Sequence, residues 1–201
     1  MRMSPQGERQ AGSADRPVSV EPEQSLSPKE LAGAVGLSES TLKRWVDSGV
    51  VAAIKTPGGH RRIPRSEAIR LIRDSSLSLV NPALLGVGDI DLARETPTSP
   101  GLEGIRLFEL LQDGRDRHVR GLLYSLYLSG RSIIEICDGP VREAMHRIGE
   151  LWKHSEAGIY QEHRASDIMV NALSQLRGTL PPAPALAPLA IGGAPSGDPY
   201  I

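Results

Sequence analysis

The chain has 201 residues, which allows one or two domains, and its apolar share of 39% is enough for a packed core. A single cysteine, Cys137, excludes an internal disulfide, and it lies in an apolar run that predicts a core position. No apolar stretch is long enough for a membrane span or a signal peptide. We therefore expect a soluble, cytoplasmic protein with no membrane partner.

The charge is distributed unevenly along the chain. The formal net charge is −1, yet residues 38–73 carry eight Lys or Arg against three Asp or Glu. A basic segment in an otherwise acidic chain predicts a face that binds a polyanion such as DNA.

Changes in composition divide the chain into five segments. The first is rich in Gly, Pro, Ser and Gln and is expected to be disordered, and a compact module follows it. A loose linker then leads to a helical region and a Pro/Ala-rich end. The expected bounds are 1–25, 26–74, 75–100, 101–179 and 180–201.

The compact module begins with two predicted helices. Residues 27–30, Ser-Pro-Lys-Glu, form a capping box with proline at the first helical position. Gly36 ends this helix, and Ser38 caps a second one whose buried side carries Leu42, Trp45 and Val46. This arrangement predicts a helix-turn-helix.

The outer side of the second helix carries short hydroxyls and long cations. Ser40 and Thr41 are suited to reading base edges, and Lys43 and Arg44 are suited to contacting phosphates or guanines in a major groove. We expect these four residues to contact double-stranded promoter DNA.

A hairpin is predicted next, with strands at 50–54 and 61–63. Gly58 and Gly59 allow the tight turn between the strands. His60, Arg61 and Arg62 follow the turn as a cationic wing, and we expect this wing, from Gly58 to Arg62, to contact an adjacent groove and the DNA backbone. A third helix starts at Pro64. The alternative is a protein-binding winged helix whose cations are merely solvated.

Residues 27–64, from the capping box through Trp45 to the Pro-Gly-Gly-His-Arg-Arg wing, resemble the MerR-type transcription regulators. The resemblance implies a winged-helix DNA-binding domain. It also implies action as a homodimer or homotetramer on paired half-sites, often as a repressor.

Helical periodicity dominates the second half of the chain and predicts four helices. Their connections are short, so we expect a mainly α protein with an antiparallel four-helix bundle behind the winged helix. The predicted inward stripes are Leu102, Ile105, Phe108 and Leu111; Val119, Leu122, Leu123 and Leu126; Val141, Met145, Ile148 and Trp152; and Ile159, Met169, Leu173 and Leu176.

A carboxylate interrupts the last stripe. Projecting from Ile159 by threes and fours places Glu162 and then the small Ser166 in inward positions, with His163 adjacent. A polar niche is predicted, in which Glu162 needs a partner. The alternative is that Glu162 lies in the exposed first turn of its helix, where the helix dipole favours a carboxylate.

The spacing from residues 149–152, Gly-Glu-Leu-Trp, to Glu162 and His163 resembles the helical cap of cobalamin-dependent, light-sensing MerR-type repressors of the CarH and LitR kind. The resemblance implies that Trp152 packs on the upper face of adenosylcobalamin and that Glu162 and His163 contact its upper ligand. Such light sensors place a histidine directly after the tryptophan. Here Lys153 stands in that position and His154 follows one position later. Neighbouring positions on a helix point about 100° apart, so His154 is not assumed to replace that histidine in a light response.

Residues 186–200 look like the first strand and loop of the Rossmann-like cobalamin domain that follows the cap in this family. The lower-ligand histidine of that domain is not found here. We therefore expect adenosylcobalamin affinity to be weak or lost.

Catalytic and metal-binding motifs are not found in the sequence, so we expect a protein that is not an enzyme and has no metal site. Two other functions stay open. One is a cobalamin-independent, excisionase-like architectural DNA-binding protein with a dimerising bundle. The other is the cap fragment of a corrinoid-carrying methyltransferase.

Overall fold

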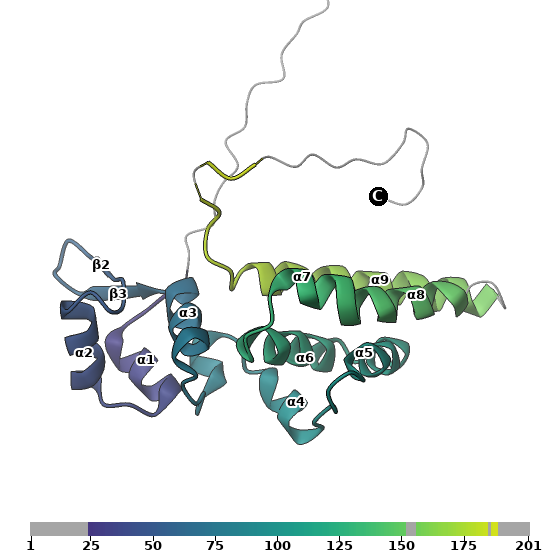
Figure 1. Cartoon of the computed structure of the whole chain (residues 1–201), viewed down its shortest axis with the longest axis horizontal. Coiled ribbons are helices and arrows are strands. Elements are labelled where there is room, and N and C mark those ends of the chain that lie inside the picture. The colour runs from purple at the N-terminus through teal and green to yellow at the C-terminus, as the bar shows by residue number, and fades with distance from the viewer. Residues whose placement is uncertain (1–23, 152–155, 185, 189–201) are drawn as a thin grey trace, which may run out of the picture.

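The computed structural model describes residues 24–151, 156–184 and 186–188, and it is mainly helical, as predicted (Figure 1). A small module with strands stands beside a group of longer helices (Figure 1). Of the segments expected to be disordered, residues 1–23, 185 and 189–201 lie outside the described residues.

The module opens with β1 (Ser25–Leu26), α1 (Pro28–Val35) and α2 (Glu39–Asp47). The predicted capping box is confirmed, because Glu30 N donates to Ser27 Oγ at 3.2 Å and Ser27 N donates to the Glu30 carboxylate at 2.7 Å. Gly36 ends α1 with a φ of 70°, a conformation that glycine adopts without strain. Local capping therefore sets both ends of the first helix.

A hairpin follows, formed by β2 (Ile54–Lys55) and β3 (Arg61–Pro64), and β1 pairs with the other edge of β3. The first strand is shorter than the predicted 50–54. The reason is that the backbone N–H groups of Val50 and Val51 donate to the carbonyl of Trp45, which closes the end of α2 and delays the strand. Helix α3 (Arg65–Ser75) completes the module.

The module has an aliphatic core of its own. Its fully buried members come from every helix and from β3: Leu31, Leu42, Ile63 and Ile69. Trp45 and Val46, which were predicted to face inward, are half-buried and pack against this core. The core holds α2 and the hairpin on the same side of the molecule.

The segment predicted as a loose linker is instead packed. It contains a 3₁₀ helix, η1 (Pro82–Leu85), and α4 (Ile90–Glu95). Four of its apolar side chains are buried: Leu79, Leu85, Val87 and Ile90. Their spacing follows neither a helical nor a strand period, so only tertiary contact reveals that they belong to the core.

Asp89 fastens this segment to the following helices. Its carboxylate accepts hydrogen bonds from Arg117 and Arg120, each at 2.8 Å. Burial alone would raise the pKa of Asp89, but the two guanidinium groups hold it below its usual value. Gly121 faces the Asp89 carbonyl so closely that there is no room for a side chain.

Four longer helices pack together behind the module: α5 (Glu103–Gln112), α6 (Asp116–Leu128), α8 (Arg142–Leu151) and α9 (Glu156–Arg177). Helices α8 and α9 lie side by side over α5 and α6 (Figure 1). In the described ranges, no helix is both long enough and apolar enough to span a bilayer.

A short α7 (Ile133–Ile136) and a π-helical turn η2 (Cys137–Val141) precede α8. This kinked entry was not predicted. Pro140 lies inside the turn and Gly139 has non-helical dihedrals, which explains the kink. Cys137 is half-buried, and burial raises the pKa of its thiol.

Two of the predicted stripes are only partly right. Leu102 is 50% exposed, whereas Leu111 is buried as predicted, and α5 also buries Leu107 and Leu110. A helix has about 3.6 residues per turn, so a strict spacing of three rotates around the helix. Residues nine positions apart, such as Leu102 and Leu111, therefore point about 180° apart. In α9, Ile159 is 43% exposed, while Met169 and Leu176 are buried as predicted, together with Ala165 and Ala172.

The last helix of the module reaches the bundle directly. Arg73 on α3 donates to the carbonyls of Gly130 and Arg131 at 3.2 and 3.3 Å, and its guanidinium lies 3.9 Å from the ring centre of Tyr127. Arg65, at the other end of α3, donates to the carbonyls of Leu85 and Gly86. Helix α3 is thus held at both ends by the segments that follow it.

Candidate DNA-binding face and helical cap

Helix α2 presents the polar residues that were predicted to contact DNA. Ser40, Lys43 and Arg44 are exposed, and Thr41 is half-buried. The hydroxyls of Ser40 and Thr41 each lie 2.9 Å from the Oγ of Ser38, the residue that caps the helix. The predicted base readers are therefore oriented by the cap in the free protein.

The two α2 cations differ in their surroundings. Lys43 Nζ lies 2.8 Å from Glu39 in an exposed pair. Such a pair contributes less than about 1 kcal/mol, so the lysine can exchange this partner for a phosphate. Arg44 has no hydrogen bond or ion pair among the residues that the structure describes.

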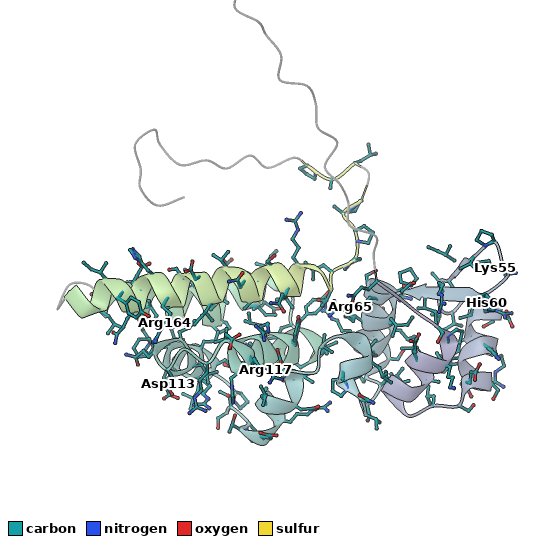
Figure 2. All side chains as sticks on the ribbon, turned by 180° about the vertical axis from the view of Figure 1, so that it is seen from behind. Lys55, His60, Arg65, Asp113, Arg117 and Arg164 are labelled. Carbon is teal, nitrogen blue, oxygen red and sulfur yellow. The ribbon has the colours of Figure 1, made fainter. Side chains whose placement is uncertain are left out.

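The hairpin turn is closed by its own backbone. Gly59 has a φ of 79° and its N–H donates to the carbonyl of Thr56 at 2.8 Å, while Gly58 and His60 are exposed. The labelled Lys55 and His60 lie near the free end of the hairpin (Figure 2). Lys55 was not among the DNA-binding residues predicted from the sequence, because a lone lysine outside the wing motif does not indicate a DNA contact. The hairpin register, which pairs Lys55 with Arg61, makes it a candidate for such a contact.

The neighbouring arginines of the hairpin have different environments. Arg61 donates to the carboxylate of Asp47, with its Nη2 at 2.5 Å and its Nε at 3.1 Å from the same oxygen. Arg62 makes no hydrogen bond or ion pair within the described ranges, although its charge adds to the Ser27 hydrogen bonds that lower the pKa of Glu30. The sequence predicted one role for both.

Four cations on α1, α2 and the hairpin make neither hydrogen bonds nor ion pairs within residues 24–151, 156–184 and 186–188. These unpaired cations are Lys29, Arg44, Lys55 and Arg62. A cation that no hydrogen bond or ion pair holds is available to a phosphate, so these four residues are candidate phosphate contacts.

The predicted cap residues are only partly described. Trp152 lies outside the described residues, together with Lys153 and His154. Glu162 lies in the second turn of α9, which begins at Glu156, so the alternative of an exposed first turn is wrong. Its side chain is 29% exposed and that of His163 is 53% exposed, so neither is fully inward.

Glu162 has the partner that its position requires. Ser166 Oγ donates to Glu162 Oε1 at 2.8 Å, and Nε2 of His163 lies 3.6 Å from the other carboxylate oxygen. Glu162 lies one helical turn before Ala165, a member of the buried stripe. The carboxylate is thus held at the edge of the bundle interior and stays accessible.

The surface around Glu162 is open and partly apolar. On α9, Ile159 is 43% exposed and Tyr160 is 68% exposed. A carboxylate and an imidazole beside uncovered apolar groups suit a large ring with apolar faces and polar edges, so these residues fit a corrin.

An open cavity of about 740 Å³ lies elsewhere, between α5, α7 and α8. Its lining includes Glu103, Arg131, Asp138, Glu143 and His146, and neither Glu162 nor His163. Glu103 and Arg131 pair with each other at 2.5 Å. This cavity is therefore separate from the site around Glu162 and His163. Within the described ranges, no group of His, Cys, Asp and Glu side chains could hold a metal ion.

Two family matches agree with this geometry. Residues 25–74 match the helix-turn-helix domain family, and they span the chain from β1 nearly to the end of α3. Residues 106–177 match the B12 binding domain family, and they extend from α5 to the end of α9. No curated protein matches the chain significantly. The chain therefore carries a DNA-binding domain followed by a cobalamin-binding helical domain, as in a CarH-like B12-binding transcription regulator.

Proposed function

We propose that this chain, which joins a helix-turn-helix domain to a B12 binding domain, is a MerR-type transcription regulator that binds promoter DNA and holds cobalamin against its helical cap. The succession of the two domains in one chain is the observation that carries the proposal. Since carriers for methyl transfer have no use for DNA, the first domain argues against the methyltransferase fragment. We place the chain among binding proteins and not among enzymes.

Helix α2 enters the major groove in this proposal. Its hydroxyls, held by Ser38, meet base edges, and Arg44 meets a guanine or a phosphate. Lys55 and Arg62 lie on opposite faces of the hairpin, so each contacts a different phosphate of the adjacent backbone. Two chains on paired half-sites would supply the affinity that one helix lacks.

The cap would hold cobalamin, in its adenosyl form, through Glu162 and His163, with the apolar Ile159 facing the ring. The bound group supplies a light-labile cobalt–carbon bond. The role of the chain is to orient and shield the upper side of the ring, and we propose that the resulting assembly is the form that occupies DNA as a repressor.

The test combines two titrations of the purified chain. In darkness, corrin absorption is followed during titration with adenosylcobalamin. The sequence alone predicts a weak or lost affinity, but the match to the B12 binding domain family leads us to expect saturation. Glu162→Gln should weaken this binding about tenfold, because a hydrogen bond to a charged group is lost. Glu109→Gln, at an exposed ion pair on α5, is the matched control and should change nothing.

Operator duplexes are then selected from random DNA, and their affinity is measured by fluorescence anisotropy with and without the cofactor, in darkness and in light. Saturable cobalamin binding with a shift in operator affinity supports the proposal. Specific DNA binding without any cobalamin binding identifies the architectural alternative. Cobalamin binding without DNA binding contradicts the regulator.

Gly149→Ala gives a further prediction about the cap. Since no atom lies within 4 Å of the added methyl group, alanine should stabilise α8 by about 0.5–1 kcal/mol, the usual gain in a helix interior. If the ring approaches α8 at this glycine, the same methyl group weakens cobalamin binding. Urea unfolding and the corrin titration measure the two effects, and stabilisation with unchanged binding would place the ring elsewhere.

A further inference from the structure

Side chains alternate between the two faces of β3, so the adjacent residues Arg61 and Arg62 lie on opposite faces of the hairpin. Side chains two apart in a strand share a face, so Arg61 lies on the same face of β3 as Ile63. Ile63 is completely buried against the helices of the module. Arg61 is therefore directed towards the helices, and Arg62 lies on the opposite face beside Ile54, its cross-strand neighbour.

Asp47 is the residue that Arg61 meets, and it is the last residue of α2. The guanidinium donates twice to one carboxylate oxygen, and the Arg61 side chain is only 30% exposed. This ion pair connects the proposed recognition helix to the hairpin. Asp47 thereby occupies the Nε and Nη2 donors of the Arg61 guanidinium and offsets its charge.

The negative charge of Asp47 also offsets an electrostatic repulsion within the hairpin. Lys55 stands directly opposite Arg61 in the ladder, and like charges at opposed positions repel. Only two residue pairs join β2 to β3, so few backbone hydrogen bonds hold the strands at one angle. The carboxylate reduces this repulsion and fixes the hairpin against α2.

We infer that the Asp47–Arg61 pair is a strut that sets the angle between α2 and the hairpin, so that Arg61 is a positioning residue for DNA binding and Arg62 is the phosphate ligand. The inference rests on the proposed function. It names which of two adjacent arginines touches DNA, and it adds Asp47 to the residues on which operator binding depends.

The test compares Arg61→Met with Arg62→Met, which remove the same charge from neighbouring positions. Operator affinity is measured as a function of salt. Loss of one phosphate contact reduces the slope of log affinity against log salt by about 0.9. We expect that reduction for Arg62→Met, and for Arg61→Met a loss of about fivefold in affinity with an unchanged slope.

Asp47→Asn supplies a test of sign. Removing a negative charge from a DNA-binding face strengthens binding if only charge matters. If Asp47 is part of the strut, Asp47→Asn instead weakens operator binding about fivefold. In the absence of DNA, amide hydrogen exchange in the hairpin then becomes faster for Asp47→Asn and for Arg61→Met, but not for Arg62→Met. Circular dichroism checks that each variant is folded.

The outcomes separate the two ideas. Equal loss of slope for both arginine variants, or tighter binding by Asp47→Asn, overturns the strut and leaves the regulator intact. If the unmodified chain binds no duplex, the proposed function fails and the strut fails with it.

Discussion

Gly121→Ala is expected to destabilise the chain by about 3 kcal/mol, as a large overpacking substitution does. The added Cβ would overlap the carbonyl oxygen of Asp89 and lie 2.9 Å from its carbonyl carbon. Both are backbone atoms, and Arg117 and Arg120 hold the same residue by its side chain. The obstacle therefore cannot move without breaking these ion pairs.

Urea unfolding of the whole chain measures this effect. Gly149→Ala is the matched control, since it makes the same change inside a helix of the same bundle and meets no neighbour. Helix propensity favours alanine at both sites by roughly 1 kcal/mol, so opposite signs isolate the packing cost at Gly121. Equal stabilisation of both variants would show that α6 does not pack against the segment that contains Asp89.

Raising the salt concentration from about 50 to about 200 mM is expected to weaken DNA binding roughly 150-fold per protomer. The reason is that Lys29, Arg44, Lys55 and Arg62 make no hydrogen bond or ion pair among the described residues and can each meet a phosphate. If each neutralises one phosphate, the slope of log affinity against log salt is about −3.6. Anisotropy titrations at several salt concentrations measure it.

Substitution of single cations checks the assignment. Lys55→Met should reduce the magnitude of the slope by about 0.9, whereas Arg94→Met should leave it unchanged. Arg94 is exposed on α4 and is already paired with Asp91 at 3.0 Å. A slope near zero for the unmodified chain would contradict a phosphate-binding face.

The arginines of α3 give a physical route between the two domains. Arg73 binds the carbonyl of Arg131, and the Arg131 side chain pairs with the buried Glu103 at the start of α5. A displacement of α5 would therefore be transmitted through these contacts to the end of α3. In the regulator that we propose, this junction connects the cap to the DNA-binding face.

Local signals in the sequence were sufficient for the elements of the first module. The capping box at Ser27 and the turn at Gly58 and Gly59 each depend on residues within four positions of one another. Such interactions form wherever the residues stand in the right order, so the helix-turn-helix and the hairpin could be predicted. The mainly helical second half followed in the same way from its periodicity.

The candidate sites were predictable as residue types and not as contacts. Glu162 was expected to need a partner, and Ser166 provides it one turn away on the same helix. Lys55 was missed because only the hairpin register places it opposite Arg61. The exact faces of α5 and α9 were also missed, since several registers fit a short apolar pattern and packing against other helices selects one.

By itself, the sequence determined that the chain is mainly helical, with a helix-turn-helix followed by a helical cap, because caps, turns and helical repeats act over a few residues. Only the tertiary structure decided that residues 75–100 are packed, that Asp89 anchors them, and that Arg61 faces Asp47 while Arg62 does not. These contacts join residues more than ten positions apart. They depend on how finished elements pack, which no local pattern encodes.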